Sequence, residues 1–459
     1  MLTPEIAAET IAAISTPPGR GGIGIVRLSG PLAVSIATEL VHPRQPLEHA
    51  HARLADVFED DGATRIDEAL ITYFAAPNSY TAEDIVEISA HGSPVVLELL
   101  LRRAMERGAR LAEPGEFTQR AFLAGKLDLT QAEAVRDLID AQTLTQVRQA
   151  ASQMGGALSQ RTTPVKQDLL ELVALLEAGI DFAEDDVDVT SQEEITRRIA
   201  EVAEPLTALE ASFTRGRVVH DGMSLALVGR PNVGKSSLFN RLVERDRAIV
   251  TAMPGTTRDL VTERISLDGI PIELVDTAGL RESIRESLDE AEQLGMLRSR
   301  EAIADATLVL VVLDATQPLH DEERELLNAI THRPAVAVLN KCDLIDRQTV
   351  ETEVAGVRAL ATSALTGEGI AALREQIVKL ATGGAQPEPG LLTNLRQHQA
   401  VKTALEALAE AAKAAAESVP HEMILLDLYR ALWALDSLTG QTTPDDVLNL
   451  IFSTFCIGK

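Results

Sequence analysis

Cysteines, aromatic residues and long apolar runs are all scarce in this chain. Its two cysteines, Cys342 and Cys456, are too few for a disulfide framework or a structural zinc site, which suits a reducing cytoplasm. Aromatic residues make up only 3%, which argues against the base-stacking platforms of single-strand binders. No uncharged apolar run approaches the roughly 18 residues of a membrane span, and the first residues lack the features of an export signal. We expect a cytoplasmic protein without membrane contact.

Basic residues are also scarce relative to acidic ones. The chain has 42 Lys and Arg against 69 Asp and Glu, a formal net charge of -27 at pH 7. Indiscriminate nucleic-acid binding requires a basic surface, so the composition argues against it while leaving room for a local basic patch. A chain of 459 residues is long enough for roughly two to four domains with buried cores.

A phosphate-binding motif is the clearest positive feature. Residues 229–236 read GRPNVGKS and match G-x-x-x-x-G-K-[ST]. An apolar run of strand character, 224–228, precedes the motif, and residues 237–242 continue with helical spacing. We expect Lys235 to reach the β- and γ-phosphates and Ser236 to ligate Mg²⁺. The predicted nucleotide contacts of this segment are Asn232, Val233, Gly234, Lys235, Ser236 and Ser237.

A second motif indicates which base is bound. Residues 340–343 read NKCD and follow the apolar run 335–339, which places them at the end of a strand. The carboxylate of Asp343 can accept hydrogen bonds from N1–H and the exocyclic amine of guanine, and adenine offers no such pair. After another apolar stretch, residues 363–365 would supply a backbone N–H to the guanine oxygen. The nucleotide is therefore predicted to be GTP, with base contacts at Asn340, Lys341, Asp343, Ser363, Ala364 and Leu365.

A third motif, DTAG at 276–279, closes a strand predicted at 272–275. Its aspartate would hold Mg²⁺ through water, and its glycine N–H would contact the γ-phosphate, so the segment can sense hydrolysis. The order of the motifs is that of a Ras-like G domain, which predicts a GTPase. Leu280 stands where Ras-type enzymes carry the glutamine that orients water, so another residue must do this. The predicted contacts here are Asp276, Thr277, Ala278 and Gly279.

Residues 251–259 occupy the first switch position. Thr257 would close on Mg²⁺ and the γ-phosphate, and Thr251 and Thr256 would also lie at the nucleotide. The amide oxygen of Asn232 and the carbonyls of 251–256 are hard oxygen ligands that could hold a monovalent cation, which would neutralise charge in the transition state. The residues alone fit a surface asparagine beside a flexible loop equally well.

The predicted G domain is inserted between helical segments. Helices are expected at 130–154 and 191–214, opened by the capping boxes Thr130/Glu133 and Ser191/Glu194, and at 164–179. After a linker at 383–390, helices are expected at 397–418, at 421–438 and from Thr443. We expect these helices to form one bundle. The acidic run 181–188 lacks the glycine and the spacing of an EF-hand loop, which favours a solvated corner of that bundle.

The N-terminal region has a different pattern. Strands are predicted at 22–28, 68–74 and 84–88 and a helix at 93–107, which indicates an α+β domain. Residues 19–24 fit the dinucleotide pattern G-x-G-x-x-G, but prolines precede it and a strand-like run follows it. That pattern binds a dinucleotide only between a strand and a helix, so we reject it.

At this point the chain resembles one family, the MnmE (TrmE) tRNA-modification GTPases, over essentially its full length. The resemblance rests on residues 16–24 (TPPGRGGIG), 114–122 (PGEFTQRAF), 126–129 (KLDL), 255–259 (GTTRD) and 455–459 (FCIGK). It implies a multidomain α/β and α+β fold. A tetrahydrofolate-binding and dimerisation domain would span 1–118, a helical domain 119–220 and 381–459 with the CIGK tail, and an inserted, potassium-activated Ras-like G domain 221–380.

The resemblance also implies a reaction. Such proteins form homodimers and join a partner, MnmG (GidA), that uses FAD and NADH. The complex adds an aminomethyl or carboxymethylaminomethyl group to C5 of the wobble uridine (U34) of certain tRNAs. A tetrahydrofolate derivative, 5-formyl- or 5,10-methylene-tetrahydrofolate, is the one-carbon donor. GTP hydrolysis, coupled to potassium-dependent pairing of the G domains, would gate the modification rather than supply its bond energy.

Ligands can be carried over by position. The resemblance assigns K⁺ to Asn232, Thr251, Met253 and Thr256, Mg²⁺ to Ser236 and Thr257, and folate to Arg27, Glu87, Lys126 and Lys459. Cationic side chains suit the glutamate tail of folate, and a carboxylate can pair with the donor edge of its pterin. Taken singly, each folate residue also fits a surface charge or a strand-face salt bridge.

The catalytic residues implied by the resemblance are Lys235 and Glu292. The family's water-orienting glutamate stands three residues before a glycine in the second switch, a spacing that Glu292 and Gly295 fit. Because residues 281–289 lengthen this switch, other glutamates remain alternatives: Glu282, Glu286 and Glu290. Cys456 is a candidate nucleophile at the modification site. Only Lys459 could activate it by sequence, so a buried, unreactive thiol is expected.

Two other classes share the G-domain motifs. A regulatory or ribosome-assembly GTPase would be a binding switch, but it would not need the folate-type N-terminal segment or the CIGK tail. A dynamin-like, membrane-remodelling GTPase would need a basic amphipathic or lipid-anchoring segment, which the sequence lacks. The tRNA-modifying GTPase is the favoured interpretation.

Overall fold

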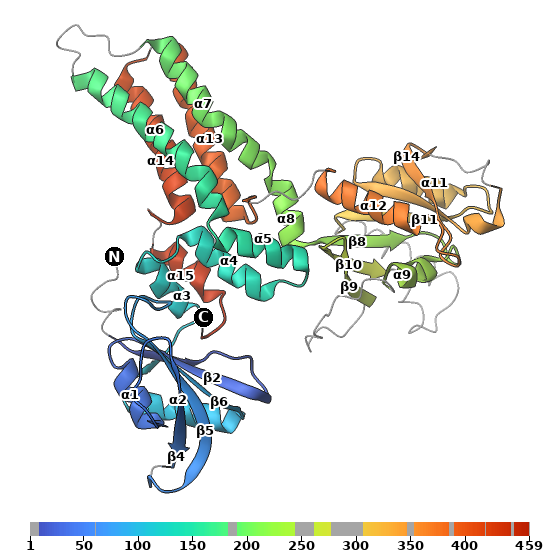
Figure 1. The fold of residues 1–459 in the computed structure, drawn as a ribbon. Coiled ribbons are helices and arrows are strands. Elements are labelled where there is room, and N and C mark those ends of the chain that lie inside the picture. Colours follow the sequence, from blue (N-terminus) through green and yellow to red (C-terminus); the bar gives the residue numbers. More distant parts are fainter. Residues whose placement is uncertain are drawn as a thin grey trace. The chain divides into compact units, whose positions relative to one another are not determined.

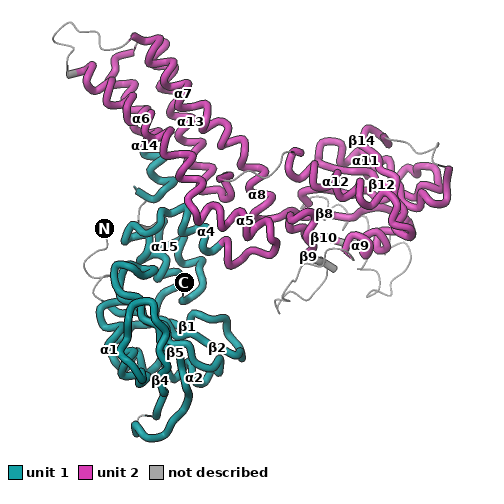
Figure 2. Tube along the Cα trace, viewed as in Figure 1, with its two compact units in different colours: residues 1–136, 433–459 teal, residues 137–432 magenta. Residues whose placement is uncertain are grey.

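The structure, a computed structural model, describes residues 9–59, 61–181, 191–243, 261–276, 306–346, 353–384, 390–417, 419–441 and 445–458. The chain forms two compact units, residues 1–136 with 433–459, and residues 137–432 (Figure 2). The domain boundaries predicted at 118, 220 and 380 stay predictions. Within the described ranges, no helix is long and apolar enough to cross a membrane.

The first unit contains a seven-stranded sheet in the order β3-β4-β5-β6-β2-β1-β7, antiparallel except between β1 and β7. The strands are β1 (Ile11–Ile14), β2 (Gly21–Ser29), β3 (His42–Pro43), β4 (Ala52–Phe58), β5 (Arg65–Phe74), β6 (Ile85–Gly92) and β7 (Arg110–Leu111). Two helices, α1 (Ala33–Leu40) and α2 (Pro94–Glu106), pack on it through a shared apolar core (Figure 1). The predicted α+β character is confirmed.

The rejected dinucleotide pattern lies in this sheet. A strand does precede it, because β1 ends at Ile14, but the pattern leads into β2 rather than into a helix. No helix N-terminus therefore faces an anion there, and the rejection is confirmed. The sequence patterns missed β1, β4 and α1, which are short or rich in alanine.

Helical elements complete the first unit. They are α3 (Glu116–Leu123), the beginning of α4 (Leu129–Asp140), the end of α14 (His421–Thr439) and α15 (Asp445–Ser453). Leu129 and Val135 of α4 form an apolar cluster with Phe452 of α15 and with Phe455. The unit therefore joins two segments that are far apart in the sequence.

The helix predicted at 130–154 is wrong as one element, because the chain forms α4 and α5 (Leu144–Met154). Thr143 interrupts it: its hydroxyl accepts a hydrogen bond from Gln146 N, and the Gln146 side chain accepts one from Thr143 N. This capping box starts a new helix. The predicted Thr130/Glu133 cap is also displaced, since Asp128 accepts from Gln131 N and the Gln131 side chain accepts from Asp128 N.

The remaining long helices lie in the second unit. They are α6 (Ala157–Asp181), which contains Pro164, α7 (Gln192–Ala211), α8 (Phe213–Asp221) and α13 (Leu395–Ala416), joined by the start of α14. The cap predicted at Ser191 is confirmed, since its hydroxyl accepts from Glu194 N. α7 packs along both α6 and α13 (Figure 1).

The second unit also holds a sheet in the order β13-β14-β12-β11-β8-β10-β9, parallel except at β9 and β13. Its strands are β8 (Met223–Val228), β9 (Val261–Leu267), β10 (Ile270–Asp276), β11 (Leu308–Asp314), β12 (Ala335–Asn340), β13 (Glu353–Val354) and β14 (Val357–Ala361). Helices α9 (Lys235–Val243) and α12 (Ile370–Thr382) share one core with it, and α11 (Asp321–Ile330) shares another. Residues 225–228 of β8 enter opposite cores in turn, which explains why this part of the strand is continuously apolar.

The helices hold this sheet domain where the chain enters and leaves it. Gly216 of α8 packs against the returning chain so closely that a Cβ there would lie 2.0 Å from Leu392 O. The buried Gln153 side chain donates to Leu391 O at 2.7 Å. A third contact joins Thr143 Oγ1 to Gly269 O, at the β9–β10 turn, at 2.7 Å.

Candidate nucleotide site and N-terminal site

The phosphate loop connects β8 to α9. Gly229 and Gly234 have φ of +148° and +98°, and a Cβ would lie 2.3 Å from Val312 O at the first and 2.2 Å from Asn340 Nδ2 at the second. Both positions therefore require glycine. α9 begins at Lys235, so the N-terminus of this helix lies directly after the loop. This backbone cradle fits the phosphates of a nucleotide.

The lysine of the motif lies against the loop itself. Lys235 Nζ donates to Gly229 O and Arg230 O, both at 2.8 Å, and the side chain is largely buried. The next residue, Ser236, lies in the first turn of α9. The backbone of Asp276 ends β10 and pairs with β8, so this predicted Mg²⁺ residue also belongs to a strand next to the loop.

The NKCD segment connects the phosphate loop to the segment 363–365. The buried Asn340 side chain donates to Val233 O at 2.9 Å and accepts from Ala364 N at 3.0 Å. Lys341 Nζ donates to Asn232 O at 2.8 Å and pairs with Asp314 Oδ2 at 2.6 Å. The structure thus brings together the phosphate loop, the NKCD segment and residues 363–365, which the sequence assigned to phosphate and base.

Asp314, at the end of β11, was not singled out from the sequence. Burial opposes its ionisation, but hydrogen bonds from Lys341 and Thr316 outweigh burial and lower the pKa of its carboxyl. The carboxylate pairs with the side chain of Lys341, whose backbone is left-handed with φ +66°. In the sequence, only the position of Asp314 at the end of an apolar run could have indicated that it pairs with Lys341.

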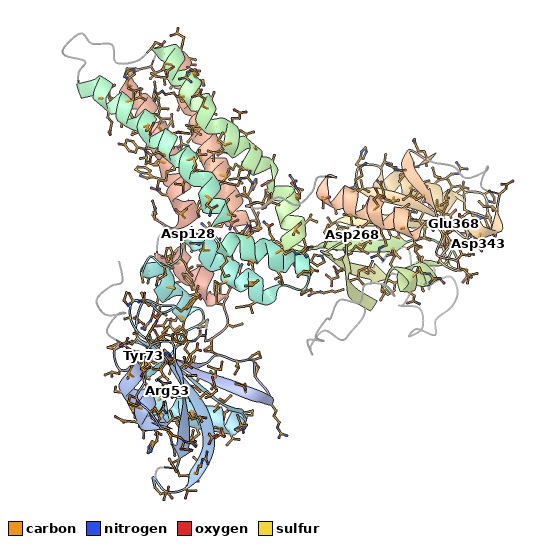
Figure 3. The ribbon with its side chains drawn as sticks, viewed as in Figure 1. Arg53, Tyr73, Asp128, Asp268, Asp343 and Glu368 are labelled. Carbon is orange, nitrogen blue, oxygen red and sulfur yellow. The ribbon has the colours of Figure 1, made fainter. Side chains whose placement is uncertain are left out.

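The carboxylate predicted to bind the base is exposed, unlike Asn340. Asp343 is exposed, in the short 3₁₀ helix η4 (Cys342–Leu344), at the same end of the sheet as Glu368 (Figure 3). Ser363 and Ala364 are buried, whereas Leu365 is 79% exposed. An exposed carboxylate beside a buried backbone segment fits a planar base that enters from solvent.

Several predicted residues lie outside the described ranges. They are Thr251, Met253, Thr256, Thr257, Thr277, Ala278, Gly279, Glu282, Glu286, Glu290, Glu292 and Lys459. The cation site and the water-orienting glutamate therefore stay predictions. Asn232 is described, and its φ of +62° is a conformation that asparagine adopts more readily than most residues.

A second group of candidate residues meets in the first unit. Arg27 on β2 and Glu87 on β6 are direct cross-strand partners and form a salt bridge at 2.7 Å. Arg27 also donates to Gly458 O at 3.2 Å, as does Ser15 Oγ at 3.1 Å, and lies over the Phe117 ring. Three of these residues were not predicted.

The C-terminal tail is fixed at this group. Pro114 pairs with Ile457, and Gly115 N donates to Cys456 O at 3.4 Å. The expectation of a buried thiol is wrong: Cys456 is exposed, because backbone pairing rather than side-chain burial holds this part of the tail. Lys126 lies in the exposed turn between α3 and α4.

Comparisons with known proteins cover nearly the whole chain. A profile for the GTP-binding protein TrmE N-terminus matches residues 10–126, and one for the MnmE helical domain matches residues 129–456. The chain is 58% identical to the tRNA modification GTPase MnmE of Koribacter versatilis over 98% of this chain and 99% of that protein. It is 40% identical to the tRNA modification GTPase MnmE of Aquifex aeolicus over 98% of this chain and 100% of that protein.

Solved structures resemble parts of the chain. The G domain of the T. maritima FeoB iron transporter is 29% identical, and the match covers 35% of this chain and 98% of that one with a TM-score of 0.25. Aquifex aeolicus Era bound to GDP.AlF4- is 23% identical, and the match covers 40% and 66% with a TM-score of 0.28.

Proposed function

Because the chain belongs to the MnmE family of tRNA modification GTPases, we propose that it is the GTP-hydrolysing subunit of a complex that modifies C5 of U34 in tRNA. The group added is aminomethyl or carboxymethylaminomethyl. The observation that carries the GTP-binding part is the double hydrogen bond of Asn340, which joins the phosphate loop to the segment 363–365. It sets the spacing between phosphates and base.

The described residues support GTP binding in a defined way. The α9 N-terminus and Lys235 bind the phosphates, and Asp343 accepts from N1–H and the amine of guanine. Ser236 and Thr257 would hold Mg²⁺, and Asn232, Thr251, Met253 and Thr256 would hold K⁺. Bound there, the two ions neutralise phosphate charge in the transition state. Glu292 would orient the attacking water.

The N-terminal group would bind a tetrahydrofolate derivative through Arg27, Glu87, Lys126 and Lys459. Arg27 supplies a fixed cation for the carboxylates of the glutamate tail, and Glu87 accepts from the donor edge of the pterin. Bound folate would supply the one-carbon unit. Two chains would pair through these N-terminal regions, while an MnmG-type partner would contribute FAD, NADH and much of the basic surface for tRNA, in the cytoplasm.

Nucleoside mass spectrometry of bulk tRNA tests this proposal. A host that lacks the gene should lose the C5-modified wobble uridines, the intact gene should restore them, and Asp343→Asn or a chain without residues 456–459 should not. Asn240→Ala, an exposed change on α9, is the matched control and should restore them. An unchanged nucleoside profile together with altered ribosomal particles would instead identify an assembly switch.

A further inference from the structure

Arg241 joins the phosphate-binding helix to the base-binding segment. It lies on α9, the helix that begins at Lys235. Its Nε donates to Ala364 O at 3.0 Å and its Nη2 donates to Leu365 O at 2.6 Å. Two donors of one planar guanidinium thus bind two consecutive carbonyls. Such a fork fixes orientation as well as distance.

The other amide groups of this segment have protein partners. Ser363 N donates to Glu368 O at 2.9 Å, Ala364 N to Asn340 Oδ1 at 3.0 Å, and Thr366 N to Ser363 Oγ at 3.1 Å. Among the described residues, Leu365 N donates to no protein acceptor. Leu365, the exposed residue of the segment, therefore also has the backbone N–H that can donate to a ligand.

The geometry of the peptide bond connects these two observations. The carbonyl of Ala364 and the N–H of Leu365 belong to one peptide unit, and in a trans peptide they point in opposite directions. When Arg241 holds the carbonyl, the N–H of Leu365 is directed away from α9. A guanine whose N1–H and 2-amino group bind Asp343 still needs a donor for its 6-oxo group.

We propose that Arg241 is a positioning residue for guanine recognition: it orients the Leu365 N–H toward the 6-oxo group of the base. This inference rests on the proposed function, because it assumes that GTP is the nucleotide. Arg241 itself touches neither base nor phosphate. It makes base recognition depend on the same helix that binds the phosphates.

A comparison of two nucleotides on the purified full-length chain tests the proposal. GTP carries the 6-oxo group. 2-Aminopurine riboside 5′-triphosphate lacks this group and the N1–H while keeping the 2-amino group, so only the Arg241-dependent contact to the 6-oxo group separates the responses of the two nucleotides to a change at Arg241. Because one neutral hydrogen bond is misaligned, Arg241→Gln should weaken GTP binding about tenfold and leave the affinity for the 2-aminopurine nucleotide unchanged. KM for GTP should rise with kcat unchanged. The GTP affinity of Arg241→Lys should lie between those of the wild-type chain and Arg241→Gln.

Asn240→Ala, the neighbouring exposed position on α9, is the matched control and should alter neither affinity. An equal loss for both nucleotides in Arg241→Gln would mean a general defect of the nucleotide site and would overturn the proposal, as would unchanged affinities. Failure of the proposed function looks different: the wild-type chain itself would then not prefer GTP over the 2-aminopurine nucleotide.

Discussion

The two candidate sites differ in what their charged and polar side chains bind. At the nucleotide site, Asn340, Lys341 and Arg241 donate to backbone carbonyls, so side chains shape the loops and the backbone is left to bind the ligand. At the N-terminal site, Arg27 and Glu87 bind each other. A ligand there must share or open an existing ion pair.

This difference predicts different responses to substitution. In a nucleotide site of this kind, the residues that hold the loops differ from the residue proposed to bind the base, the exposed Asp343. In the N-terminal site, Arg27 and Glu87 both hold the structure and would bind the ligand. A change there should therefore alter stability and ligand affinity together. Asp343→Asn and Gly458→Ala test this contrast, and Asp137→Asn, outside both sites, gives the effect of a purely structural change.

The largest effect is expected for Asp343→Asn. Loss of charge-assisted hydrogen bonds to the base should weaken GTP binding about 100-fold, while the amide should favour xanthosine triphosphate, whose 2-oxo group accepts from an NH₂. Thermal stability of the nucleotide-free chain should not change, because Asp343 is exposed. Competition titrations with both nucleotides check this, and unchanged GTP affinity would show that Asp343 does not touch the base.

A smaller effect is expected at the join between helices and sheet domain, outside both sites. The hydrogen bond to Asp137, at 3.0 Å, outweighs burial and raises the pKa of His220 to about 9. A raised pKa stabilises the fold below pH 6.5, and that contribution disappears as pH rises through 9. Asp137→Asn should cost about 2 kcal/mol near pH 6.5 and less at pH 10, with GTP affinity unaltered. Urea unfolding at both pH values measures it, and a pH-independent loss would contradict it.

The smallest effect is expected for Gly458→Ala. Gly458 has φ +95°, and a Cβ would lie 2.8 Å from Ile14 O, so alanine should displace the tail and cost about 1 kcal/mol. Arg27 would lose its carbonyl partner, and tetrahydrofolate binding should weaken several-fold while GTP binding stays the same. Calorimetric titration with both ligands, with Ser453→Ala on α15 as control, measures this. Unaltered folate affinity would show that stability and ligand binding do not change together at the N-terminal site.

Sequence reasoning succeeded where a site is local in sequence. The phosphate loop, the NKCD segment and the strands before them each lie within about ten residues, and hydrophobic periodicity placed them correctly. It failed where contacts join distant residues: Arg241 and Ala364 are 123 positions apart, and Arg27 and Gly458 are 431 apart. The break before α5 was missed because a capping box at Thr143 outweighs helical spacing that continues on both sides.

The composition of the first unit has a consequence for synthesis. Its apolar cluster needs Phe452 and Phe455 to cover Leu129 and Val135, yet residues 137–432 are translated in between. At typical elongation rates this delay is roughly 15 to 60 s. For that time Leu129 and Val135 lack the two phenylalanines that cover them in the folded unit, so the unit that is begun first is completed last.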